Sequence, residues 1–155
     1  MLNGQFTRGD GLVTPNTITE LGRRTMLAAA FQGDSLDLYA ALVFGSAAPV
    51  VVEADLEEPT IGVNGYARIP LAQGNVDWPT LDMEGALARI ASKVMTWVAT
   101  GVGFDKEVNR IALMRGAARD DARQVWSVGS VWLAPLTIVP ATPEIQRQFS
   151  YAVRV

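Results

Sequence analysis

Four carboxylates within a short stretch form the densest group of reactive side chains in this sequence: Glu53, Asp55, Glu57 and Glu58. Paired carboxylates can hydrolyse glycosidic bonds, and carboxylate oxygens also bind hard cations. An EF-hand calcium loop is not formed, because Pro59 interrupts its ligand spacing. The surrounding stretch 47–65 carries prolines and glycines that are typical of a loop. We therefore expect a solvated loop or a weak cation site rather than a catalytic site.

The tryptophans are a second candidate for a binding function, because exposed aromatic rings stack on sugars: Trp78, Trp97, Trp126 and Trp132. Large aromatic side chains more often lie in a protein core. Trp126 and Trp132 are separated by an even number of residues, so a strand would place both on one face. We expect core packing in general, with Trp78, beside Pro79 in a loop, as the best candidate for exposure.

Two short motifs have functional counterparts in other proteins. Gly101-Val102-Gly103 looks like a fragment of a phosphate-binding loop, but the further glycine and lysine are absent at the required spacing, so we expect a turn. Arg8-Gly9-Asp10 matches the tripeptide of integrin ligands. This triplet often arises by chance, and we expect no adhesive role for it.

The composition removes further classes of chemistry. The 155-residue chain lacks histidine, the usual general base, and lacks cysteine, the thiol nucleophile and disulfide former. A net charge of −3, with no basic cluster longer than Arg23-Arg24, argues against nucleic-acid binding. No apolar run approaches the ~20 residues that span a bilayer, and the first residues lack a secretory signal. We expect no enzyme, no catalytic, cofactor-binding or metal-binding residue, and neither nucleic acid nor membrane as a partner.

A helix is expected near the N-terminus, behind an arm. Residues 1–14 mix glycines and polar residues without a period, which is typical of an arm that is flexible or ordered by assembly. Thr17 and Glu20 have the spacing of a capping box, and Gly33 stands where a helix would stop. The pattern predicts a helix from Ile18 to Phe31, with an apolar face made of four residues: Ile18, Leu21, Ala28 and Phe31.

The remainder of the chain predicts strands. Leu36 to Phe44 alternates at the period of a strand and is apolar on both faces, so we expect both faces to be covered. Tyr66 to Leu71 is a short strand that Pro70 places at an edge or end. Met83 to Val98 fits a helix or a strand, and its β-branched and aromatic second half favours a strand. Three further strands are predicted over 108–115, 123–133 and 145–155.

These elements predict one fold class. Short strands with frequent turns are typical of sandwiches and barrels. We expect a mainly β protein, a single-domain, jelly-roll-like β-sandwich over residues 1–155, with one N-terminal helix and an extended N-terminal arm.

Four short elements follow one another along the chain: Thr14 to Gly22, Leu38-Tyr39-Ala40-Ala41-Leu42, Gly65-Tyr66-Ala67-Arg68, and Trp78. Their order resembles a loose group of small tailed-bacteriophage structural proteins, in which a leading helix, an LYxxL strand, a GYxR element and a later tryptophan precede a β-rich half. Val108 to Leu113 is similar to the strand that follows in that group. The resemblance implies a virion subunit and brings no catalytic residue with it.

We accordingly expect a non-enzymatic structural subunit of a bacteriophage virion, made in the host cytoplasm and forming homo-oligomers. The leading interpretation is a capsid cement or decoration protein that binds neighbouring subunits such as the major capsid protein. A neck or tail accessory protein, with neck or tail subunits as partners, and a receptor or glycan-binding module are the alternatives. An enzyme that uses carboxylates alone is the remaining hypothesis.

Overall fold

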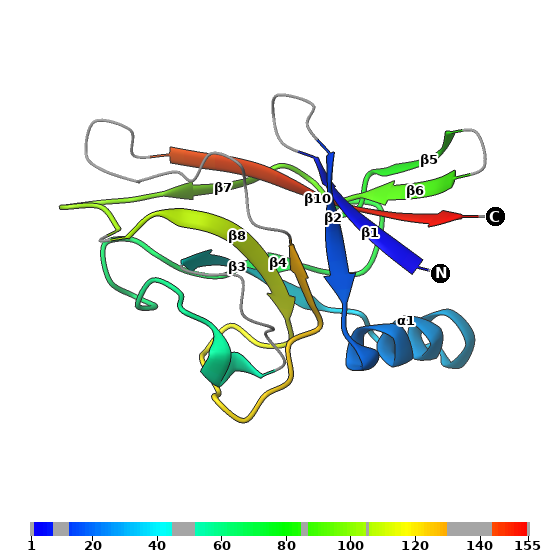
Figure 1. The fold of residues 1–155 in the computed structure, drawn as a ribbon, viewed down its shortest axis with the longest axis horizontal. Helices are drawn as coiled ribbons and strands as arrows, with labels where there is room; N and C mark the ends of the chain where they lie inside the picture. The colour runs from blue at the N-terminus through cyan, green and yellow to red at the C-terminus, as the bar shows by residue number, and fades with distance from the viewer. Residues whose placement is uncertain are drawn as a thin grey trace.

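A computed structural model of the chain describes residues 2–7, 13–44, 52–84, 87–104, 106–129 and 144–154. Within these ranges the protein is mainly β, with one α-helix and antiparallel strands (Figure 1). The elements are β1 Leu2–Thr7, β2 Val13–Ile18, α1 Glu20–Gln32, β3 Leu38–Phe44, the 3-10 helix η1 Glu53–Asp55, β4 Ile69–Leu71, β5 Thr80–Glu84, β6 Leu87–Ala91, β7 Met95–Val98, β8 Val108–Met114, β9 Ser127–Gly129 and β10 Glu144–Arg154. The predicted mainly β class with one helix is confirmed.

Antiparallel pairing joins the strands in the order β4-β3-β8-β9-β2-β1-β10-β6-β5, and β7 also pairs with β10. β4 lies at one end of this order and contains Pro70. Proline suits that position because it has no N–H to donate to a further strand. The edge strand predicted for this segment is therefore confirmed, while β5 forms the opposite end of the order.

Strand β10 is the longest strand and has partners along both of its edges. Residues 148–153 pair with β1, residues 150–154 pair with β6, and residues 144–147 pair with β7. Three residues, 92–94, separate β6 from β7 and stand opposite two residues of β10, which makes a β-bulge. The side-chain amide of Gln148 donates to the carbonyl of Ser92 at this bulge. The strand that we expected within Met83 to Val98 is confirmed as β6 and β7 with the end of β5.

The first residues form a strand where an arm was expected. Residues 2–7 pair as β1 with β2 on one side and with β10 on the other. Backbone hydrogen bonds on both edges hold this segment within the sheet, which corrects the expectation for residues 2–7. Arg8-Gly9-Asp10 lies outside the described residues.

Helix α1 begins later than predicted. Thr17 belongs to β2, and Thr19 is the N-cap, with its hydroxyl oxygen accepting a hydrogen bond from the Gly22 N–H at 3.0 Å. The Thr19 hydroxyl also lies 2.8 Å from the carbonyl of Trp126, so the cap ties the helix to the segment that precedes β9. The helix ends at Gly33 with φ 75°, as predicted, because glycine adopts this left-handed conformation without strain.

The helix exposes two of its large apolar side chains, Leu27 and Phe31. Its buried residues are the small Gly22 and Thr25, whereas Leu27 is 57% and Phe31 is 83% exposed. The predicted apolar face is therefore wrong at Phe31. The small Gly22 and Thr25 lie on the buried face of the helix, Met26 packs against the margin of the core, and Leu27 and Phe31 face solvent.

Strands β3 and β8 form the centre of the core. All residues of β3 except Tyr39, and all residues of β8 except Asn109, are buried. Leu42 and Ile111 belong to the larger core cluster, on one face of the pair. The other face contributes a second cluster: Ala41, Val43, Leu56, Ala112, Met114, Val125 and Val128. The predicted strand with both faces covered is thus confirmed.

Truncation after Ser150 tests the central position of β10. The missing residues pair with β1 and with β6, so their removal leaves two strand edges without hydrogen-bond partners. We expect little soluble folded protein, measured by soluble yield and circular dichroism. A chain that lacks only Val155 is the control and should fold normally. Native-like yield and spectra from the longer truncation would contradict this view of β10.

Candidate functional site

The structure divides the acidic group into two buried and two exposed carboxylates. Glu53 is 0% exposed and the side chain of Glu58 is 3% exposed. Asp55 and Glu57 are exposed. The expectation of a solvated loop is therefore wrong for Glu53 and Glu58, and it is confirmed for Asp55 and Glu57.

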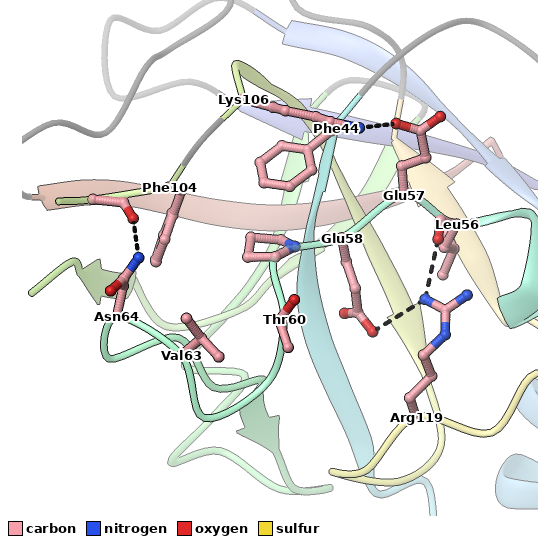
Figure 2. A pocket seen from close by; sticks show the side chains of 12 residues that line it. Phe44, Leu56, Glu57, Glu58, Thr60, Val63, Asn64, Phe104, Lys106 and Arg119 are labelled. Atoms are coloured by element: carbon pink, nitrogen blue, oxygen red, sulfur yellow. Dashed lines mark hydrogen bonds and ion pairs between the residues drawn. The ribbon is translucent and has the colours of Figure 1, made fainter. Parts of the chain in front are cut away.

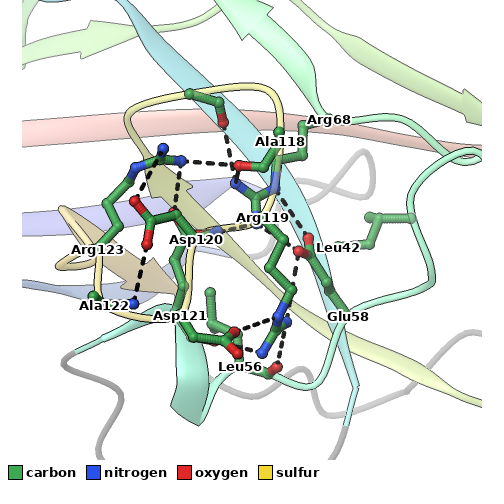
Figure 3. Close-up of polar contacts among 12 residues, drawn as sticks. Leu42, Leu56, Glu58, Arg68, Ala118, Arg119, Asp120, Asp121, Ala122 and Arg123 are labelled. Carbon is green, nitrogen blue, oxygen red and sulfur yellow. Dashed lines mark hydrogen bonds and ion pairs between the residues drawn. The ribbon is translucent and has the colours of Figure 1, made fainter.

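Arg68 occupies the position between the two buried carboxylates. Its Nε–H and one Nη2–H bind the two oxygens of Glu58, at 3.2 and 2.5 Å, and Nη2 also donates to Glu53 at 2.9 Å. Nη1 donates to the carbonyls of Gly116 and Ala118, each at 3.1 Å (Figure 3). An arginine carries five N–H donors, so this buried guanidinium is fully hydrogen-bonded. The positive charge beside the two buried carboxylates is thus supplied by the protein's own side chain.

The loop 116–123 closes over the same carboxylates. Glu53 accepts hydrogen bonds from Arg123 Nη1 at 3.1 Å and from the Asp120 backbone N–H at 2.9 Å. Arg119 donates to the backbone carbonyls of Leu56 and Glu53, at 3.1 and 2.9 Å. We call the whole set the Arg68 cluster: Glu53, Glu58, Tyr66, Arg68, Arg119 and Arg123. It joins two segments that are far apart in the sequence.

Tyr66 connects this cluster to the central strand. Its hydroxyl donates to Glu58 at 3.0 Å and accepts from the Leu42 backbone N–H at 3.1 Å. The ring lies in the core at 1% exposure and packs edge-on against Phe104, with 5.5 Å between ring centroids. A bulge shifts the β3–β8 register between Val43 and Phe44, just beyond this contact.

The electrostatics of the cluster keep Arg68 and Tyr66 in their ordinary charge states. Burial lowers the pKa of Arg68, but hydrogen bonds and attraction from Glu58 and Glu53 outweigh this effect and raise the pKa above the ordinary value. The pKa of the Tyr66 phenol is raised well above its usual value, first by burial and then by repulsion from Glu58. The guanidinium therefore stays charged and the phenol stays neutral at physiological pH.

A pocket of about 300 Å³ lies beside the cluster (Figure 2). Glu58 and Arg119 line its inner part, and Phe44 contributes an aromatic ring. Glu57 and Lys106, whose charged atoms are 2.9 Å apart, form an exposed ion pair at the pocket. Every charged side chain that lines this pocket thus has a partner of opposite sign.

The chemistry of the pocket follows from these pairings. The oxygens of Glu58 accept three hydrogen bonds, from Tyr66 and twice from Arg68, so this carboxylate is held by the protein itself. Glu57 faces Lys106 at the surface. Among the described residues no group of three or more metal-ligating side chains occurs. The arrangement therefore ties the loop 52–68 together through Glu58.

The glycine motif forms a turn, and Gly103 of this turn lines the same pocket. The Gly103 N–H donates to the Thr100 carbonyl at 3.2 Å, which closes the turn that we predicted for Gly101-Val102-Gly103. The side chain of Asn64 donates to the Gly103 carbonyl at 2.6 Å. Gly65 lies so close to Thr100 and to the Val98 carbonyl that a Cβ would meet them at 3.1 to 3.3 Å.

The tryptophans divide as the sequence predicts. Trp97 and Trp126 are 3% and 2% exposed, and the indole N–H of Trp97 donates to the Ala67 carbonyl at 3.1 Å. Trp78 is more exposed than Trp97 and Trp126, and it packs at the margin of the core. Trp132 lies outside the described residues. Core packing is therefore confirmed for Trp97 and Trp126.

A second, apolar pocket of about 400 Å³ surrounds Trp78 and is called the Trp78 pocket. Its apolar lining comes from α1, β5, β6 and the connecting segments: Met26, Leu36, Trp78, Pro79, Leu81, Ile90 and Trp126. Gln73 and Asn75 are the polar side chains in its lining, and Gln73 already accepts a hydrogen bond from the Leu36 N–H. The sequence pointed to Trp78 but not to the helix residue Met26 across the pocket.

Asp77 holds the loop that supports this pocket. Its carboxylate lies 2.6 Å from the Lys93 ammonium and accepts the Ala72 N–H at 2.7 Å. The Lys93 backbone N–H donates to the Asp77 carbonyl at 2.7 Å, so the loop is tied to the bulge between β6 and β7. The hydrogen bond from Lys93 is the main reason that the pKa of Asp77 lies below its usual value.

No protein-family model, no curated protein and no solved structure matches this chain. The described residues contain no helix long and apolar enough to cross a membrane.

The substitution Arg68→Met tests the Arg68 cluster. It leaves Glu58 and Glu53 buried without the Arg68 guanidinium, although Arg123 still contacts Glu53, and breaking a buried ion pair in this way costs about 3–5 kcal/mol. Lys106→Met is the control with the same chemical change, because its ion pair with Glu57 is exposed and contributes less than about 1 kcal/mol. Urea unfolding measures both free energies. An equal loss in the two variants would contradict the importance of Arg68.

The substitution Asp77→Asn tests the loop contact through its pH dependence. Because the folded-state pKa is lowered, the stabilising contribution is complete above the ordinary value of 3.8 and is lost as the pH falls through the folded pKa. We expect the variant to be less stable than the parent at neutral pH, with a difference that shrinks as the pH falls below 3.8. Denaturant unfolding across this range measures it. Asp82→Asn, at an exposed residue, is the control. If the loss of stability in Asp77→Asn did not change with pH, the charge of the Asp77 carboxylate would not stabilise the fold.

Proposed function

We propose that this chain is a non-enzymatic structural subunit of a bacteriophage particle, acting as a capsid cement or decoration protein bound to neighbouring capsid subunits. A role as a neck or tail accessory protein is the alternative within the same class. The observation that carries the proposal is the distribution of side chains: the buried carboxylates are used inside the fold, whereas large apolar residues face solvent.

The first support comes from the acidic group. Glu53 and Glu58 are the carboxylates with the most enclosed surroundings, and both are bound by arginines of the same chain. A general acid or a nucleophile needs a carboxylate that can reach a substrate. The cluster instead provides a rigid attachment of loops, which a subunit under mechanical load in a particle requires.

The second support is the number of large apolar side chains at the surface. Those at least about half exposed are Leu27, Phe31, Val63, Val76, Leu81, Met83, Val94, Val98 and Val102. Monomeric soluble proteins rarely leave extended apolar surface without a partner, so such residues favour a protein that is covered by neighbours. An assembling subunit accounts for them.

The third support is the role of the residues that carry the phage resemblance. Tyr66 and Arg68 meet Leu42 through the Tyr66 hydroxyl and the Glu58 carboxylate. These residues thus hold the loops to the core, which is the role expected of them in a structural protein. We further propose that the strands close as a jelly-roll-like sandwich, since β3 and β8 are covered on both faces.

A receptor or glycan-binding module is the second candidate, on account of the partly exposed Trp78. Sugar sites need polar groups placed around the stacking ring. The lining of the Trp78 pocket is mainly apolar, so an apolar protein surface suits it better than a sugar. Glycan-array binding that is lost in Trp78→Ala with an unchanged circular dichroism spectrum would favour the glycan role instead.

Quantitative mass spectrometry of purified particles of the phage that encodes this chain tests the proposed function. We expect the protein to be present, with hundreds of copies per particle for a capsid lattice role. A copy number that matches one closed ring would point to the neck or tail. Scaffold and lysis proteins of the same phage serve as controls for contamination. Absence of the chain from clean particles would overturn the proposal.

A further inference from the structure

The chain contains two Asn-Gly pairs, and the structure places them in different surroundings. Asn3-Gly4 lies in β1, which pairs with β2 along one edge and with β10 along the other. Asn64-Gly65 lies in the loop between η1 and β4. An asparagine followed by glycine is prone to deamidation, because glycine has no side chain that hinders attack by its own backbone nitrogen.

Asn64 and Gly65 are the central residues of a tight turn. The Tyr66 N–H donates to the Val63 carbonyl at 3.0 Å, and both central residues have positive φ, 51° for Asn64 and 79° for Gly65. Turns of this class favour the Asn-Gly pair and are closed by the N–H of their last residue. Gly65 is exposed, and its N–H donates to no residue that the structure describes. The Gly65 nitrogen is therefore not held by a hydrogen bond within the described chain.

Two hydrogen bonds connect this turn to residues 100–103. The Thr100 N–H donates to the Asn64 carbonyl at 2.8 Å, and the Asn64 side-chain amide donates to the Gly103 carbonyl at 2.6 Å (Figure 2). These contacts have to open before the amide carbon can meet the Gly65 nitrogen. Opening a surface turn costs less than releasing β1 from two neighbouring strands, because fewer hydrogen bonds break together.

We propose that Asn64 is the residue at which this folded chain undergoes spontaneous deamidation. The Gly65 nitrogen forms a bond to Cγ of Asn64, the bond from Cγ to Nδ2 breaks, and the Gly65 proton passes through solvent to the nitrogen that leaves as ammonia. Water then opens the five-membered imide and returns a proton to the Gly65 nitrogen. Cleavage at Cγ gives aspartate, and cleavage at the backbone carbonyl carbon gives isoaspartate.

Either product weakens the connection between the two turns. A carboxylate at position 64 has no N–H to donate, so it faces the Gly103 carbonyl as a second acceptor. Isoaspartate also lengthens the backbone by one methylene group. A Cβ on Gly65 would already meet Thr100 and the Val98 carbonyl at 3.1 to 3.3 Å, so this turn has little room for a longer chain.

Peptide mapping of the purified full chain by mass spectrometry, after incubation at mildly alkaline pH, tests the proposal. We expect Asn64 to be converted at least about tenfold faster than Asn3, a ratio set by the difference in local opening. Isoaspartate, separated from aspartate by chromatography, identifies the imide intermediate. The same chain unfolded in guanidinium is the control and should convert both residues at comparable rates.

Two results of this mapping would overturn the proposal. One is a folded chain in which Asn64 reacts no faster than Asn3, because local opening would then not favour the turn. The other is conversion of Asn64 without isoaspartate, because the Gly65 nitrogen would then not be the nucleophile.

The substitution Asn64→Asp supplies the aspartate product directly. We expect a lower midpoint of guanidinium unfolding than in the parent, because the hydrogen bond to the Gly103 carbonyl is lost. Asn75→Asp makes the same chemical change at an exposed residue and should leave the midpoint nearly unchanged. Equal midpoints in the two variants would show that the modification does not loosen the turn.

Discussion

Burial of a guanidinium removes most of its hydration, and the conformation around Arg68 follows from the need to compensate that loss. Two carboxylates and two backbone carbonyls must all reach one planar group, so the segment with η1 and the loop 116–123 have to meet there. Glu53, once placed, also fixes Arg123 and the backbone of Asp120. The path of a long stretch without regular secondary structure is thus determined by one charge and the acceptors that it needs.

The Arg68 cluster keeps the charges of Glu53 and Glu58 away from solvent. Glu58 and Tyr66 connect the cluster to β3. The Tyr66 hydroxyl donates a hydrogen bond to Glu58 and accepts one from the backbone N–H of Leu42. The charges of Glu53 and Glu58 are paired with arginines within the fold. The surface carries exposed apolar side chains on α1 and β5, among them Phe31 and Leu81.

The two ends of the described chain depend on each other. β1 lies between β2 and β10, and β10 contacts β1, β6 and β7, so neither terminal strand is complete without segments from the middle of the chain. Most of the close residue pairs in this fold are long-range. Such pairing forms late and cooperatively, because loop closure has to precede the contacts that stabilise it. The long-range pairs are arranged around the core formed by β3 and β8.

The sequence by itself determined what depends on local patterns. Alternation predicted the buried strand up to Phe44, Gly33 marked the helix end, and Pro70 marked an edge strand, because period, left-handed backbone and a missing N–H are properties of nearby residues. Only the tertiary structure decided that Glu53 and Glu58 are buried and that Phe31 faces outward. Those outcomes depend on partners distant in the chain, such as the carbonyl of Ala118, 50 positions from Arg68. No local period encodes which partner a side chain will meet.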